Sequence, residues 1–148
     1  MAKGSRRQAR VAALQALFEA DKSGHPGAEA LKRIIESQRV PAQSAAYAKV
    51  LIEGVLAQQG ELDKTIAGAA TAWPVDQLPA VDRNILRLAI HEMLEDNGTP
   101  VEAVINEAVE LAKQFGSDNS AKFVNGVLGT IERRQQEADP NHATAQRR

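Results

Sequence analysis

The residues best suited to bind a charged partner lie at the start of the chain. The first eighteen residues contain no acidic side chain and carry four cations, Lys3, Arg6, Arg7 and Arg10. Read as one α-helix, these cations fall within one arc of about 100°. Guanidinium groups donate hydrogen bonds in a fork that matches phosphate oxygens, so the cluster suits a nucleic-acid backbone. A solvated basic N-terminus is the alternative that this segment leaves open.

Further along the same stretch the side chains become apolar. Leu14 and Leu17 lie on the same strip as the cations, with Val11 and Phe18 beside it. One side of a single helix therefore changes from basic to apolar along its length. We expect the later turns to pack against the body of the protein, while the first two turns project from it and expose their arginines.

A second polar cluster occurs in the run from Asp118 to Gly129. Its polar side chains would form a rim at a helix start, where unpaired backbone N–H groups favour an anion such as phosphate. This rim consists of Asn119, Ser120, Lys122 and Asn125. Gly126 and Gly129 each cost a helix about 1 kcal/mol relative to alanine. Close helix packing through the notches they leave is the alternative interpretation, and the two are compatible.

The residue pattern does not favour catalysis or metal binding. Glu107 and Glu110 lie three residues apart, on the expected solvated face of an amphipathic helix. The histidines have no metal-ligand spacing, and the sequence contains no cysteine, Gly-rich phosphate loop or serine elbow. We therefore expect no enzyme activity, no cofactor and no metal site.

Charged residues also occur in the apolar central segment. Asp82 is expected in the first turn of a helix, where it interacts favourably with the dipole, and Arg83 and Arg87 are expected on its exposed side. Glu92 falls within the apolar arc of the same helix. Because an unpaired buried charge is costly, Glu92 should have a partner, either an arginine or a helix N-terminus.

Composition is typical of a helical globular protein. The 148 residues are 43% hydrophobic and 25% charged, with only 3% aromatic residues and a net charge of -1. Nucleic-acid affinity must therefore come from local clusters of cations and not from overall charge. No apolar run approaches the roughly 20 residues of a membrane span, and the N-terminus lacks the pattern of a secretory signal. A cytoplasmic location is the default expectation.

Every segment long enough to read has a helical period. We predict helices over about 5–22, 27–38, from 41 with a break at Gly60, 79–95, 101–115 and 119–135. The segment from Trp73 to Pro79 is a hinge near the middle of the chain. Thr99 is predicted to be an N-cap, with Pro100 in the first turn. The residues from Ala138 onward are polar and aperiodic, which predicts a disordered tail.

Four blocks of this sequence resemble the NusB family of bacterial transcription antitermination factors, in the order in which the family has them. They run from Arg6 to Phe18, from Val81 to Arg87 with Glu92, from Pro100 through Ile105 to Lys113, and from Asp118 to Leu128. Each block is weak alone, but together they are specific and cover residues 5–131.

The resemblance implies an all-α fold with two small helical bundles packed together. These would lie at about 5–71 and 79–136 within one domain at 1–137, followed by the tail at 138–148. It also implies binding of boxA-type single-stranded RNA jointly with the ribosomal small-subunit protein NusE. That complex would join RNA polymerase in an antitermination complex that reads through terminators in ribosomal RNA transcription. Without the partner, an exposed apolar surface could pair with itself in a homodimer.

The residue pattern indicates the cations and Asn119 as RNA contacts, and the resemblance implies an RNA role for Phe123 and the whole NusE set. The RNA set is Lys3, Arg6, Arg7, Arg10, Asn119, Lys122 and Phe123, and the NusE set is Leu17, Phe18 and Asp82. Phe123 also falls on the apolar face of its helix, so an edge position that stacks on a base would reconcile both roles. Asn119 stands where many relatives carry Asp, and Phe18 where some carry Tyr.

Two other functions compete with this one. The N-terminal RNA-binding module of a ribosomal-RNA cytosine methyltransferase resembles the same family, but such an enzyme needs a further cofactor-binding domain. In a purely structural helical interaction protein, the arginines would be solvated surface residues without a ligand. Steep salt dependence of RNA binding would separate the adaptor from the structural protein.

Overall fold

The computed structural model describes residues 3–95 and 98–138, which form seven α-helices, one 3-10 helix and no strand. The elements are α1 (Lys3–Ser23), α2 (Gly27–Ser37), α3 (Ala42–Ala57), α4 (Gln59–Ala69), η1 (Val75–Gln77), α5 (Ala80–Leu94), α6 (Val101–Phe115) and α7 (Ser120–Ala138). The all-helical prediction is confirmed, and the helix ends agree within a few residues. The part of the predicted tail that follows Ala138 lies outside the described residues.

Prolines set the starts of four helices. Pro26, Pro41, Pro79 and Pro100 each directly precede a helix, with φ between -52° and -59° and an extended ψ. The prediction that Thr99 caps α6 is wrong, because Pro100 takes that position and no side chain caps the helix. The break predicted at Gly60 falls at Gln58, between α3 and α4.

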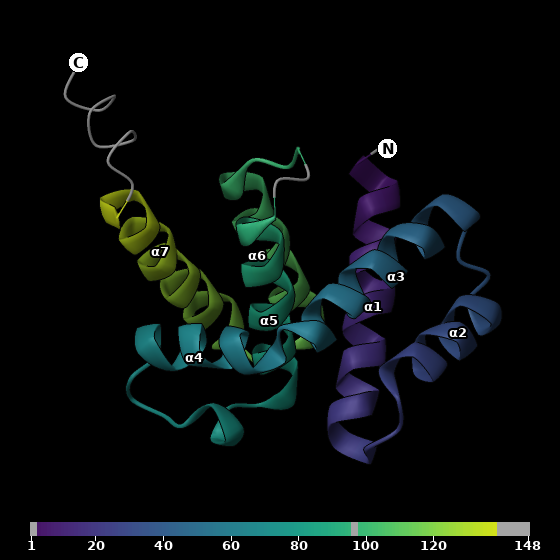
Figure 1. Ribbon diagram of the computed structural model, residues 1–148, viewed down its shortest axis with the longest axis horizontal. Coiled ribbons are helices and arrows are strands. Elements are labelled where there is room, and N and C mark those ends of the chain that lie inside the picture. The colour runs from purple at the N-terminus through teal and green to yellow at the C-terminus, as the bar shows by residue number, and fades with distance from the viewer. Residues whose placement is uncertain (1–2, 96–97, 139–148) are drawn as a thin grey trace.

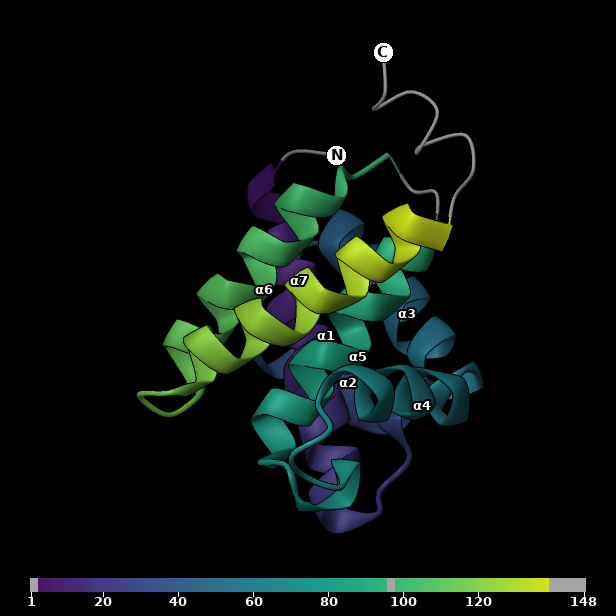
Figure 2. The same cartoon turned by 90° about the vertical axis from the view of Figure 1, so that its left-hand side faces the viewer.

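The helices pack in two groups around α5 (Figures 1 and 2). In one group α1 packs against α2 and α3, and in the other α6 packs against α7. Helix α5 contacts α1, α3, α4, α6 and α7, and every residue from Asp82 to Met93 is buried. Helix α4 also contacts α7, so it touches both groups, and the bundle limits at 71 and 79 stay a prediction.

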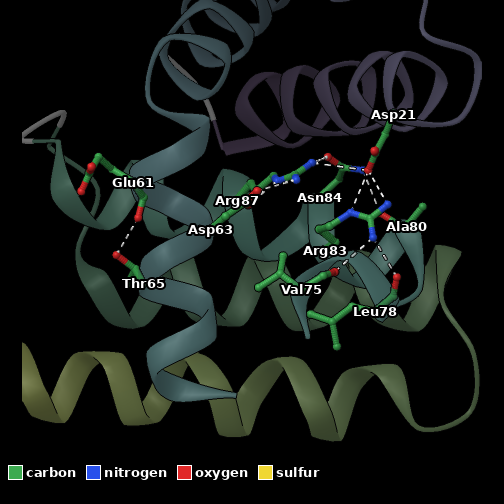
Figure 3. A network of polar contacts seen from close by, with 10 residues as sticks. All are labelled: Asp21, Glu61, Asp63, Thr65, Val75, Leu78, Ala80, Arg83, Asn84 and Arg87. Carbon is green, nitrogen blue, oxygen red and sulfur yellow. Dashed lines mark hydrogen bonds and ion pairs between the residues drawn. The ribbon is translucent and has the colours of Figure 1, made fainter. Parts of the chain in front are cut away.

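Because neighbours surround α5, its polar side chains are buried and require partners. Arg83 and Arg87, predicted on an exposed side, are buried and pair with carboxylates of α1 and α4 (Figure 3). Arg83 lies 2.7 Å from Asp21, and Arg87 lies 2.8 Å from Asp63. Burial acts to raise the pKa of Asp21, but hydrogen bonds from Arg83 and Asn84 outweigh it, so that pKa is lowered.

Arg83 also fixes the segment that joins α4 to α5. Its Nη1 donates hydrogen bonds to the carbonyl oxygens of Val75 and Leu78, at 3.1 and 3.0 Å (Figure 3). These two carbonyls lie at either end of η1, so one buried guanidinium holds the short 3-10 turn in place. The segment predicted as a hinge is therefore anchored to α5.

The glycines of the helices differ in what surrounds them. A Cβ on Gly54 would lie 2.2 Å from the ring of His91, so α3 and α5 approach closely there. His91, predicted on a helix surface, is accordingly buried. A Cβ on Gly126 would meet nothing within 4 Å, and one on Gly129 would meet only Arg133 at 3.6 Å. The close-packing explanation for Gly126 and Gly129 is therefore wrong.

Candidate nucleic-acid interface

Arg10 does not project from the N-terminal helix. It is 4% exposed, and its Nε and Nη2 donate to the two carboxylate oxygens of Glu92 on α5, at 2.8 and 2.9 Å. The hydroxyl of Tyr47 on α3 donates to the same carboxylate at 2.7 Å. Helix α1 packs against α3 and α5, so its second turn is covered and not exposed as predicted. The expectation that Glu92 has a partner is confirmed, and of the two alternatives the partner is an arginine.

The buried pair keeps Arg10 charged. Burial acts to lower the pKa of Arg10, but the hydrogen bonds and the charge of Glu92 outweigh it, so the pKa is raised. The guanidinium is thus committed to a carboxylate of its own chain. Arg10 therefore links α1 to α5 through its hydrogen bonds to Glu92.

Arg7 lies at the edge of the same contact and is partly accessible. Its side chain is 52% exposed, and its Nε and Nη2 donate to Glu107 on α6, at 3.0 and 2.8 Å. These hydrogen bonds are the main cause that raises the pKa of Arg7. Glu107, predicted on a solvated face, is buried beneath this pair. A guanidinium has five N–H donors, so Arg7 keeps Nη1 for an outside acceptor.

Arg6 and Lys3 complete the N-terminal set. The guanidinium carbon of Arg6 lies 5.3 Å from the centroid of the Tyr47 ring, and its Nη1 donates to the hydroxyl of Thr99. Arg6 therefore bridges α3 and the start of α6. Lys3 is the first residue of α1, and its side chain lies outside the described part of the chain.

The predicted residues of the C-terminal run come together around one hollow. Asn119, Lys122 and Phe123 line a hollow of about 570 Å³ together with Gly126 of α7 and the segment from Ala69 to Trp73. Asn119 and Lys122 are exposed, and Phe123 is half-buried against the core. The edge position expected for Phe123 agrees with this geometry. A cation, an amide and an aromatic ring thus converge at the start of α7.

Asp82 on α5 holds the first residue of α7 through a buried hydrogen bond. Its carboxylate is buried and accepts a hydrogen bond from the Ser120 hydroxyl at 2.7 Å, and that hydroxyl accepts one from the Ser117 backbone N–H at 2.9 Å. The loop before α7 approaches so closely that a Cβ on Gly116 would lie 2.5 Å from Ser120. Asp82 therefore supports the start of α7 beside the hollow, and its place on a partner surface stays a prediction.

The other two residues expected to face a partner differ in accessibility. Leu17 is buried in the core, because it faces the helices packed against α1. Phe18, one residue on, is 37% exposed. Only Phe18 of this set presents an apolar surface to solvent.

Trp73 was not among the candidates from the sequence. It is 61% exposed and lines the same hollow as Phe123. It is the single tryptophan of the chain and lies outside every periodic segment. The sequence signal that could have identified it is a large aromatic residue outside every helix face that is predicted to form the core.

The two clusters of candidate residues are at the starts of α1 and α7, and these two helix starts lie toward opposite ends of α6 (Figure 2). Arg6 contacts Thr99 just before α6 begins, Arg7 contacts Glu107 near its middle, and Asn119 follows its end. Fifteen helical residues span about 22 Å at about 1.5 Å per residue. The structure does not join the clusters in one pocket, and a ligand touching both must extend along α6.

Other kinds of site find no support in the described ranges, 3–95 and 98–138. No group of three or more His, Cys, Asp or Glu residues there is arranged to hold a metal ion. No helix within them is long and apolar enough to cross a membrane.

Comparisons with known proteins point to one family. The family model of the NusB family matches residues 7–133. Transcription antitermination protein NusB of Chloroflexus aggregans is 49% identical over 128 residues, which cover 85% of this chain and 85% of that protein. The protein of the same name from Roseiflexus sp. is 47% identical over 134 residues, covering 89% of this chain and 94% of that one.

Solved structures agree with the sequence comparisons. NusB of T. maritima has a TM-score of 0.79 at 35% identity, with 85% of this chain and 89% of that chain covered. A crystal structure of the antitermination factors NusB and NusE in complex with double-stranded RNA contains a similar chain. Its TM-score is 0.82 at 28% identity, with 90% of this chain and 99% of that chain covered.

Proposed function

We propose, because this chain belongs to the NusB family, that it is a transcription antitermination factor that binds RNA without catalysis. In this proposal it binds boxA-type single-stranded RNA jointly with the ribosomal protein NusE. The complex then joins RNA polymerase and promotes read-through during ribosomal RNA transcription. The solved complex of NusB and NusE with double-stranded RNA, which contains a similar chain, supports NusE and RNA as the kinds of partner.

The observation that carries this proposal is the hollow at the start of α7. It brings together Asn119, Lys122 and Phe123, three residues that the sequence pattern and the family resemblance assign to RNA. A lysine suits a phosphate, an amide can form hydrogen bonds with a base edge, and an aromatic ring can stack on a base. Bases are open to stacking and edge recognition when they are unpaired, which favours single-stranded RNA.

Arg6 and Arg7 supply the second contact region in this proposal. Arg7 is partly exposed, and Glu107 holds its Nε and Nη2 in one orientation. Such an orientation reduces the freedom that the side chain loses when it binds a phosphate. Lys3 adds charge to the same helix start, whereas Arg10 supports the region from inside. The strand would then run along α6 from Arg6 and Arg7 to the hollow.

The partner surface is proposed to include Phe18 on α1. Leu17 and Asp82 are buried, so they act by shaping the helices beneath this surface. Phe18 also offers an apolar contact for a second copy of the chain when NusE is absent, and sedimentation with and without NusE tests this.

The test of the proposed function is a titration of fluorescently labelled boxA-like RNA, read by anisotropy, with and without NusE. Arg7→Ala should weaken binding and reduce the slope of log affinity against log salt by about 0.7 for one phosphate contact. The matched control is Lys64→Ala, which removes an exposed cation from α4. Binding by the Arg7 variant with parental affinity and slope would exclude Arg7 as a contact. Absence of RNA binding even with NusE would refute the function itself.

A further inference from the structure

Trp73 has the exposure of a binding residue and not of a core residue. The residue is 61% exposed, which is the highest value among the large hydrophobic residues in the described ranges. It does not belong to the core cluster or to the partly buried residues packed against it. An indole left in water without a structural role is typical of a surface that another molecule covers.

The backbone that carries Trp73 is held in place. The next residue is Pro74, whose ring fixes φ at -59°. Beyond it, Arg83 donates to the carbonyl oxygens of Val75 and Leu78, and Asp21 holds Arg83 in turn (Figure 3). The indole is therefore presented from an anchored segment, which lowers the conformational entropy lost on binding.

The walls of the hollow suit a flat, polar-edged ligand. Phe123, Lys122 and Asn119 come from α7, while small residues from Ala69 to Ala72 line the side next to Trp73. Gly126 adds room, since a Cβ there would meet nothing within 4 Å. The volume of about 570 Å³ lies within the range of small-molecule sites, about 300–1,000 Å³.

Polar groups at the rim are available to such a ligand. Lys122 forms no ion pair with any described residue, and the Asn119 amide forms no hydrogen bond with any of them. Both side chains are exposed at the mouth of an otherwise apolar hollow. An amide beside a cation complements a base edge joined to a phosphate better than it complements an apolar peptide.

We propose that this hollow is a subsite for one unpaired RNA base, with Trp73 as the residue that stacks on it. Asn119 forms hydrogen bonds with the edge of the base, and Lys122 contacts the adjoining phosphate. Phe123 forms the opposite apolar wall. This inference rests on the proposed RNA-binding function and assigns to it a residue and a mode of recognition.

The single tryptophan makes the inference directly measurable. Trp73 emission is recorded while boxA-like RNA is added to the full chain, alongside the anisotropy of the labelled strand. We expect the emission to be quenched with the same midpoint as the anisotropy change, and acrylamide to reach Trp73 less. RNA strands with one abasic position, placed in turn along the sequence, should lose the quenching at one position.

Variants separate stacking from folding. Trp73→Ala should weaken RNA binding about 10-fold or more, as expected for one base stacked on an aromatic ring, while Trp73→Phe should keep most of the affinity. Val50→Ala on α3 is the matched control, since Val50 is 60% exposed and lies outside both clusters. Circular dichroism should show unchanged helix content in all three.

The remaining outcomes distinguish failure of the base subsite from failure of the proposed RNA-binding function. RNA binding with unchanged emission and unchanged acrylamide access, and with parental affinity for Trp73→Ala, overturns the subsite while the proposed function stands. No RNA binding in the anisotropy assay overturns both. A third outcome is that NusE without RNA shields the indole from acrylamide, measured as a difference against Trp73→Phe. That result would assign the hollow to the protein partner and overturn the base subsite.

Discussion

Replacing Arg10 with alanine tests whether this residue supports the fold or touches RNA. The structure places both members of the Arg10–Glu92 pair in the core, joined by hydrogen bonds of 2.8 and 2.9 Å. Removing one member of such a pair leaves an uncompensated buried charge, which costs about 3–5 kcal/mol. We expect Arg10→Ala to lower the free energy of unfolding by that amount.

This loss would be large for a single domain. Domains of this kind are stable by about 5–15 kcal/mol, so the variant would lose about a fifth or more of its stability. Tyr47 would still donate to Glu92 at 2.7 Å, which places the loss toward the lower end of the range. A double variant, Arg10→Met with Glu92→Leu, removes both charges and should be more stable than Arg10→Ala.

Urea unfolding followed by circular dichroism measures the effect, and RNA affinity is measured where every variant remains folded. Arg33→Ala is the control, because its pair with Glu19 is exposed and should contribute much less. The reasoning is refuted if Arg10→Ala unfolds within about 0.5 kcal/mol of the parent yet loses RNA affinity. Arg10 would then be a direct RNA contact, as its angle on the helix predicts.

Three further predictions concern Tyr47 and Gly54 on α3 and Gly126 on α7. Burial, together with the hydrogen bond to Glu92, raises the pKa of Tyr47 to about 12. The stability from this shift should be complete below about pH 10 and lost as the pH rises toward 12, and Tyr47→Phe should abolish it in alkaline unfolding curves. Gly54→Ala should lower the free energy of unfolding by about 1–3 kcal/mol, because its Cβ would collide with His91. Gly126→Ala places its Cβ in open space and should raise the free energy of unfolding by up to about 1 kcal/mol. Equal changes in the melting temperature of the two glycine variants would contradict this difference.

Local patterns determined the helices well. Prolines and apolar periodicity act within a few residues of each helix end, so the limits of α5 and α6 could be predicted from sequence. Glu92 falls within the apolar arc of α5, and from that position followed the inference that it needs a partner, which Arg10 supplies.

The accessibility of the charged residues could not be predicted in the same way. An angle on a helix says which residues share a face, but not which other helix covers that face. Arg10 meets a carboxylate 82 positions away, and Arg7 meets one 100 positions away. Nothing in the local pattern of α1 encodes these pairings. The burial of Asp82 could not be predicted for the same reason, since its hydrogen-bond partner Ser120 lies 38 positions along the chain.

These distant pairings explain why a helix with no exposed binding residue matters for the proposed RNA surface. Within α5, Asp82 fixes the start of α7, Arg83 fixes the segment that carries Trp73, and Glu92 fixes α1 through Arg10. Each contact supports one region that the RNA is proposed to touch. Because each is buried, an α5 substitution should lower stability and RNA affinity together, whereas Trp73→Ala should lower affinity alone. The polar side chains of α5 thus act as a common frame that orders the surface without being part of it.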